Sequence, residues 1–341
     1  MADQTPTTAS CRLPAWCLLL LYFSLLVLGG AVLAPPLFFL GKSFASWVDG
    51  QQWHNIPLVG ALAHEAAKAD FQRYFNRAVL VCALVFLWPT MRMLRLGRAE
   101  LPRLRPQPGE IRDGIFGFLL AGGFLLGMGF LLLHWGVFKP NPKAVWSSVL
   151  MASAMSAAAV AVLEEYVFRG ALTSLAQRAW APLPAMVFIA ALFAVLHFMH
   201  PPEALRIADD EVAAWKGLEL VGIMFGQLFV WQTFTGGFLT LLAVGLMLGW
   251  ARLVTGGLWL AMGLHAGWVF ALKAFSGATR RAKSLPDGFP EYLIGKDLKT
   301  GLLPLGFLLA TALCLGCYLR MTRAARTSRP RFQGSETQER P

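Results

Sequence analysis

Long apolar runs separated by short polar segments constrain the fold of this chain more than any other feature of its sequence. About 20 consecutive apolar residues form a helix long enough to cross the hydrocarbon core of a bilayer. Of the 341 residues, 56% are hydrophobic and only 14% are charged, whereas a soluble domain carries about 25% charged residues. The sequence therefore predicts an all-α fold, a polytopic membrane helix bundle with about eight transmembrane helices.

The expected spans can be placed on the chain from its apolar runs. The first run is too long for the 7–15-residue apolar core of a secretory signal, so we expect a retained helix that ends before Pro35-Pro36. Residues 41–77 are expected to form an interfacial loop or amphipathic helix, and residues 217–232 to be interfacial or re-entrant. The eight spans are expected at about 14–34, 78–93, 115–138, 145–180, 184–199, 234–253, 258–275 and 302–319.

Basic residues next to these runs predict the orientation in the membrane. Six arginines lie between residues 92 and 112, and the chain ends in another basic segment. Because cytoplasmic loops are enriched in Arg and Lys, both termini are expected to be cytoplasmic. Residues 276–299, which include Arg280, Arg281 and Lys283, fit this arrangement less well. The net charge of +11 thus indicates contact with the lipid bilayer, and no nucleic-acid partner is expected.

Three ionisable side chains lie inside the fourth expected span, at Glu164, Glu165 and Arg169. An ionised side chain at the centre of a bilayer costs roughly 2.5–3.5 kcal/mol by the lower estimates, so such residues are usually functional or paired. Glu165 and Arg169 are four residues apart and can form an ion pair on one helix face. Taken alone, this pair is better explained as an internal salt bridge than as a catalyst. Glu164 is rotated about 100° away.

Two histidines in other spans can meet Glu164. Spans four and five are expected to form a hairpin that turns near residues 180–184, where prolines interrupt the helix. Glu164 precedes this turn by about 16 residues and His197 follows it by about 16, so a uniform helical rise places them at the same depth. A carboxylate beside a histidine in a poorly hydrated cavity is suited to activating water as a general base. His265, from the seventh span, could donate a hydrogen bond to an oxyanion.

A zinc site is the alternative interpretation of the same residues. Glu164, His197 and His265 are side chains that zinc accepts as ligands, but the sequence has no HExxH spacing. No cofactor is expected under the first interpretation, and zinc is the less favoured alternative.

At these residues the chain resembles the CPBP family (CAAX protease and bacteriocin-processing, also called Abi or type II CAAX-prenyl-endopeptidase-like). The family carries the motifs EExxxR, FxxxH and HxxxN on successive transmembrane helices. Here they are Glu164-Glu165 with Arg169, Phe193 with His197, and His265 with Val269. The resemblance covers about residues 144–275 and implies an intramembrane glutamic endopeptidase with a bundle of about eight helices.

The resemblance also implies a role for each matching residue. Glu164 would activate water with His197, and His265 would help to form the oxyanion hole. Support for the site would come from Glu165, Arg169 and Phe193. Val269 departs from the family because it stands where asparagine is usual, and valine cannot donate a hydrogen bond. Losing one oxyanion donor costs about 10²–10³ in rate, so a catalytically weak or inactive scaffold or bacteriocin-immunity-type binding protein is the alternative.

The expected protein has four parts and lies in the bacterial inner membrane. Residues 1–143 contain transmembrane helices 1–3 and the basic cytoplasmic loop 92–112, and residues 144–275 form the protease-like core. Residues 276–322 contain a loop and the last transmembrane helix, and residues 323–341 form a basic, disordered tail. The expected substrate is a membrane-anchored protein or peptide.

Overall fold

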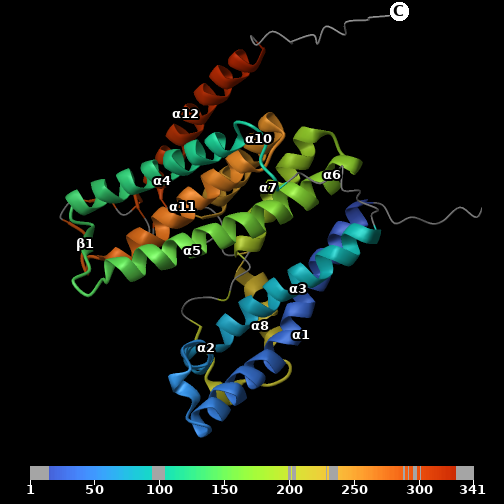
Figure 1. Cartoon of the computed structure of the whole chain (residues 1–341), viewed down its shortest axis with the longest axis vertical. Helices are drawn as coiled ribbons and strands as arrows, with labels where there is room; N and C mark the ends of the chain where they lie inside the picture. Colours follow the sequence, from blue (N-terminus) through green and yellow to red (C-terminus); the bar gives the residue numbers. More distant parts are fainter. Residues whose placement is uncertain are drawn as a thin grey trace, which may run out of the picture. The chain divides into compact units, whose positions relative to one another are not determined.

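The computed structural model is helical almost throughout and divides into two compact units (Figure 1). The first unit contains residues up to Arg105 together with Val162–Leu253, and the second contains Pro106–Ala161 and the chain from Val254. The all-α class is confirmed, with the addition of one short pair of strands. The structure describes residues 15–93, 104–198, 201, 205–227, 229, 237–286, 289–290, 292–294, 298–299 and 301–327.

The first unit is built around the long helix α1, which packs along α3 and also contacts α2, α6 and α8. Its apolar core contains Tyr22, Phe38, Phe71 and Phe75, all of them almost inaccessible to solvent. The α-helices in this unit are α1 (Ala15–Gly50), α2 (Pro57–Lys68), α3 (Phe71–Met93), the end of α5 (Trp146–Glu165), α6 (Thr173–Ala179), α7 (Pro182–Phe198), α8 (Lys216–Gln227) and α10 (Leu239–Thr255). The shorter turns are η1 (Trp53–Asn55), the π-helix η2 (Tyr166–Leu172) and η3 (Asp209–Glu211).

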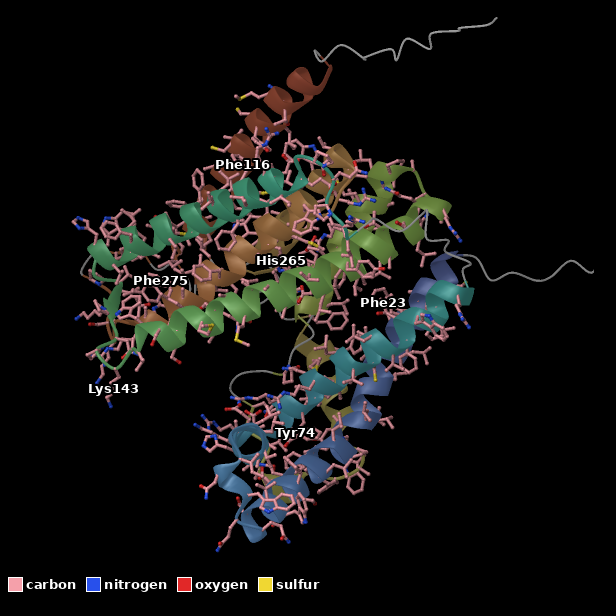
Figure 2. All side chains as sticks on the ribbon, in the orientation of Figure 1. Phe23, Tyr74, Phe116, Lys143, His265 and Phe275 are labelled. Carbon is pink, nitrogen blue, oxygen red and sulfur yellow. The ribbon has the colours of Figure 1, made fainter. Side chains whose placement is uncertain are left out.

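The second unit pairs α4 (Glu110–His134) with α11 (Trp259–Ala278). Two strands, β1 (Phe138–Pro140) and β2 (Thr279–Arg281), continue from these helices and pair antiparallel. The start of α5 and the last helix, α12 (Leu302–Thr327), complete the described elements of this unit. Phe275, labelled in Figure 2, belongs to the core cluster that lies where α4, α11 and β1 meet.

Glycines allow α4 and α11 to pack backbone against backbone. Gly263 and Gly267 are four residues apart on α11, and a side-chain carbon at either would overlap a backbone carbonyl of α4, at Gly114 or Phe118. Small residues at this spacing let membrane helices approach closely. The sequence interpretation did not single out this pair of glycines, although the spacing is visible in the chain.

Helix α1 continues through Pro35 and Pro36 to Gly50, so the prediction that the first span ends before these prolines is wrong. Proline has no backbone N–H to donate, so Pro35 leaves the carbonyl of Ala31 without its usual helical partner. Gly217, on α8, packs so closely against this carbonyl that any side chain there would overlap it. Packing against a neighbouring helix is one way in which membrane helices tolerate an internal proline.

Four helices among the described residues are long and apolar enough to cross a membrane, namely Leu20–Gly50, Glu110–His134, Trp146–Ala179 and Leu302–Thr322. Two shorter apolar helices, Pro182–His197 and Leu239–Thr255, match the fifth and sixth expected spans. An all-helical membrane protein is therefore supported, whereas the count of about eight spans stays a prediction.

Some expected segments lie partly outside the described residues. Residues 94–103 of the predicted cytoplasmic loop are among these, and so are residues 328–341 of the predicted tail. The last helix reaches Thr327, so it extends into the segment that was expected to be disordered.

The contact between α8 and α1 can be tested with two glycines of the same helix. Gly217→Ala places a methyl group against the Ala31 carbonyl, whereas a side chain at Gly222 meets open space. We expect Gly217→Ala to lower the free energy of unfolding by about 1–3 kcal/mol, the usual cost of overpacking. The control Gly222→Ala should be neutral or stabilising, because alanine favours a helix over glycine. Thermal unfolding of both variants in detergent checks this, and equal stabilities would contradict the close approach.

Candidate functional site

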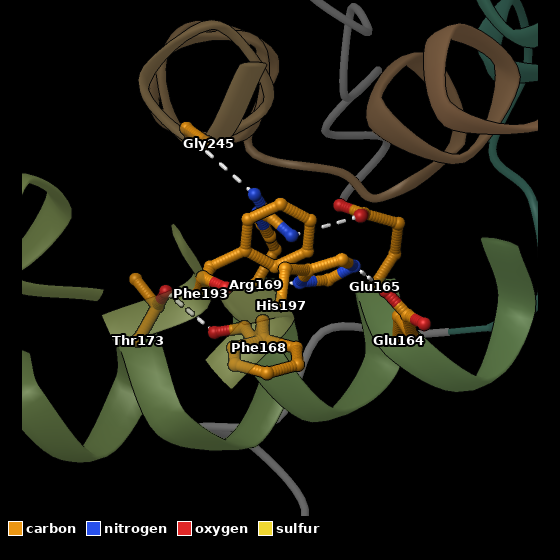
Figure 3. A network of polar contacts seen from close by, with 8 residues as sticks. All are labelled: Glu164, Glu165, Phe168, Arg169, Thr173, Phe193, His197 and Gly245. Carbon is orange, nitrogen blue, oxygen red and sulfur yellow. Dashed lines mark hydrogen bonds and ion pairs between the residues drawn. The ribbon is translucent and has the colours of Figure 1, made fainter. Parts of the chain in front are cut away.

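The candidate site lies in the first unit, where α5, η2, α7 and α10 meet (Figure 3). The predicted hairpin is present: α6 ends at Ala179, Trp180 is extended, and α7 begins at Pro182. Proline suits the first position of a helix, because that backbone N–H would have no helical partner in any case. The hairpin brings the motif of α5 and η2 alongside that of α7.

A buried ion pair lies at the centre of the site. Arg169 Nη1 is 3.0 Å from Glu165 Oε1, and the side chains are 1% and 0% exposed. Arg169 Nη2 also donates a hydrogen bond to the Gly245 carbonyl on α10, at 3.3 Å. Because Gly245 has no side chain, its backbone can lie against Ala190 of α7, which brings α10 close to the arginine. The predicted i,i+4 pair is therefore present, and it ties α10 to the hairpin.

Phe193 forms an aromatic layer beside this ion pair. Its ring centroid is 4.4 Å from the guanidinium carbon of Arg169 and 4.1 Å from the centroid of the His197 ring. Phe168 packs edge-on against Phe193, with ring centroids 5.2 Å apart. A guanidinium over an aromatic face gains a cation–π attraction that strengthens when the pair is desolvated. Phe193 therefore contacts both the buried cation and the histidine, and this geometry suits the supporting role predicted for it.

Glu164 and His197 form a second, more open pair. Glu164 Oε2 lies 3.6 Å from His197 Nε2, and the two side chains are 30% and 33% exposed. His197 Nδ1 is 2.9 Å from the carbonyl oxygen of Phe193, one turn earlier on α7. Since a carbonyl can only accept, Nδ1 carries a hydrogen and Nε2 faces the carboxylate. The contact predicted from hairpin geometry is present, and it is favourable when one further proton lies on Nε2 or on the carboxyl group.

The helix widens directly after the two glutamates. Residues Tyr166–Leu172 form a π-helix, and Thr173 Oγ1 donates to the Phe168 carbonyl at 2.8 Å. Such segments are rare and occur frequently at functional sites. The sequence interpretation assumed regular α-helix over this stretch and missed the π-helix, because no residue pattern in it signals one.

His265 belongs to the second unit and is 6% exposed on α11 (Figure 2). It lies between the two glycines that pack against α4. Val269 follows four residues later on the same helix, so the two positions share a face. The oxyanion role of His265 stays a prediction. Within the first unit, the structure brings together Glu164 and His197 from the three residues predicted to be catalytic.

A metal site was the alternative interpretation. Within each unit, the described residues contain no group of three or more His, Cys, Asp or Glu side chains placed to hold a metal ion. Glu164 and His197 supply two possible ligands, so zinc in the first unit would need a further ligand from elsewhere.

Residues 144–271 match the model of a protein family described as type II CAAX prenyl endopeptidase Rce1-like. The matched segment contains all three motifs, from Glu164 to Val269. The match confirms the family resemblance found in the sequence. No curated protein and no solved structure matches the chain.

The buried pair can be tested by removing one partner and then both. Arg169→Met should lower the free energy of unfolding by about 3–5 kcal/mol, because it leaves Glu165 as an uncompensated buried charge. Combining it with Glu165→Leu should restore most of this loss, since apolar side chains of similar volume often replace a buried pair without cost. Thermal unfolding of the single and double variants measures the difference.

The exposed pair formed by Lys216 and Glu219, 3.1 Å apart, is the matched control. Lys216→Met should change the free energy of unfolding by less than about 1 kcal/mol. An equal effect at Arg169 and Lys216 would show that burial of the Arg169 pair does not control stability.

Proposed function

We propose that this chain, which belongs through residues 144–271 to the type II CAAX prenyl endopeptidase Rce1-like family, is an intramembrane glutamic endopeptidase. It would hydrolyse a peptide bond of a membrane-associated protein or peptide. The observation that carries the proposal is the 3.6 Å contact between Glu164 and His197, two partly exposed side chains beside a buried ion pair.

Glu164 and His197 would act together as the base that activates water. One of the two groups takes a proton from water, and the water oxygen bonds to the carbonyl carbon of the substrate. The same proton then passes to the amide nitrogen as the C–N bond breaks. The hydrogen bond from Nδ1 to the Phe193 carbonyl keeps Nε2 directed at the carboxylate through this cycle. His265 would donate a hydrogen bond to the oxyanion that forms between these steps.

The buried pair explains why one of two adjacent carboxylates would react. Glu165 is fully buried and bound to Arg169, so solvent and substrate cannot reach it. Glu164 is 30% exposed and has His197 beside it. Phe193, packed between Arg169 and His197, would transmit the rigidity of the buried pair to the imidazole.

The surroundings of the site fit a substrate that is itself held in the membrane. Apolar helices of span length carry or adjoin the motifs, so a peptide bond near the bilayer would reach them more readily than one in a soluble protein. We place the protein in the bacterial inner membrane with both termini cytoplasmic, and we expect neither a cofactor nor a nucleic-acid partner.

A non-catalytic membrane scaffold or immunity-type binding protein is the second candidate, and Val269 is the observation that favours it. Valine stands where the family carries asparagine, so the proposed oxyanion hole has one side-chain donor fewer. Such a protein would keep the fold and the buried pair while it bound a peptide without cleaving it.

Glu164→Gln should reduce peptide cleavage by at least about 10²-fold, because it removes the base and keeps the shape of the side chain. The assay uses purified protein and membrane-anchored peptides, including one with a prenylated CAAX end. Glu219→Gln, which removes an exposed carboxylate, is the control. Equal cleavage by wild type and Glu164→Gln would exclude the mechanism. Activity that disappears with a chelator and returns with zinc would instead support the metal alternative.

Val269→Asn should raise the rate of cleavage by up to about 10²–10³-fold, because it restores a donor near His265. The gain should appear in kcat and should be lost again in the double variant with His265→Ala. Val269→Thr is the matched control, since threonine keeps the β-branched shape with a shorter donor. A folded Val269→Asn protein with no gain in kcat would contradict this account of the departure from the family.

A further inference from the structure

One end of the second unit carries a dense group of basic residues that the proposed protease site does not use. It lies where α4, β1, β2 and the start of α5 come together, and Lys143 marks it in Figure 2. Residues 134–146 and 278–286 contain five Lys or Arg residues and no Asp or Glu. The next acidic residue along the chain, Asp287, lies outside the described residues. We call this group the basic hairpin: Lys139, Lys143, Arg280, Arg281 and Lys283.

Strand pairing places like charges directly opposite each other. Lys139 pairs with Arg280 in the antiparallel register of β1 and β2. The register is fixed on both sides, because Ala282 N donates to Val137 O at 2.9 Å and Asn141 N donates to Ala278 O at 2.8 Å. Like charges opposite each other destabilise a strand pair. An anion bound between them would remove this repulsion.

A hollow of about 480 Å³ lies beside the strands. Its polar side chains are the ammonium group of Lys139, the imidazole of His134 and the hydroxyl of Ser284. Its other walls include Trp135, Leu285 and Pro286. A space with cationic donors on one side and apolar walls on the other matches a phosphate group attached to an acyl-carrying glycerol.

The hollow lies at the expected boundary between bilayer and water. The candidate span Glu110–His134 ends beside it, and the candidate span that starts at Trp146 begins near it. Trp135 and Trp146 are both exposed at this end, as is typical of the tryptophan belts at membrane interfaces. Lipid head groups are therefore the anions nearest to the basic hairpin.

Membrane orientation does not account for these cations. Arginines also flank the opposite end of α4, in the segment 104–112. Because the positive-inside rule places basic residues on one side of a span, one of the two basic ends requires another cause. Binding of an anionic ligand supplies that cause for the basic hairpin.

We propose that this hollow and the basic hairpin form a binding site for the phosphate head group of an anionic phospholipid. Lys139 and Lys283 would contact the phosphate, while Trp135 and Leu285 would lie along the upper part of the acyl chains. The site is independent of the proposed protease activity, so either proposal can fail without the other.

The test is lipid titration of the full-length protein in detergent, followed by native mass spectrometry. The probes are dioleoylphosphatidylglycerol, dioleoylphosphatidylcholine and inorganic phosphate. Phosphatidylglycerol should bind the wild type more tightly than phosphatidylcholine. Lys139→Gln with Lys283→Gln should weaken binding of phosphatidylglycerol about 30-fold, the effect expected from two interfacial charges.

Lys68→Gln with Arg77→Gln is the matched control, since it removes two exposed cations from the first unit. It should leave the binding of phosphatidylglycerol unchanged. Lys139→Arg with Lys283→Arg should retain binding, which separates loss of charge from loss of fold. Equal weakening in the control, no weakening in the glutamine variant, or equal binding of phosphatidylcholine would overturn the proposal. Displacement of the lipid by millimolar inorganic phosphate would assign the site to free phosphate instead and overturn it as well.

Discussion

The buried ion pair between Arg169 and Glu165 is the interaction on which the rest of the site depends. Neither charge can leave the other without a large cost, because both are removed from water. The guanidinium also binds the backbone of α10 at Gly245 and packs on Phe193 of α7. One cation thus connects three segments of the chain. The position of His197, which stacks on Phe193, follows from that connection.

Two pairs of opposite character stand side by side, and the contrast separates stability from chemistry. The inner pair is closed to solvent, whereas Glu164 and His197 are about one third exposed. An exposed pair at 3.6 Å gains little from Coulomb attraction, so it contributes little to folding and stays free to exchange a proton. A site that hydrolyses peptides needs both kinds of pair. Val269 lies outside this arrangement, on α11 of the second unit.

The parts of the fold that depend on local chain geometry could be predicted from the sequence. Equal helical rise on both arms of a hairpin predicted the contact of Glu164 with His197, and i,i+4 spacing predicted the pair of Glu165 with Arg169. Prediction was wrong at Pro35, because whether a helix survives a proline depends on a neighbour distant in sequence, here Gly217. The π-helix was missed for a related reason, since tertiary contacts of Arg169 accompany it and no local pattern signals it.

The π-helix also bears on how the two arms of this helix are related along the chain. A wide turn holds one residue more than an α-helical turn, so the segment behaves as if a residue had been inserted into a regular helix. Removing one residue between Tyr166 and Leu172 would let the segment close into an α-helix and rotate all that follows by about 100° relative to the glutamates. The number of residues in this stretch is therefore as much a part of the site as their identity. Chains that share the site should differ by substitution here and not by a change in length.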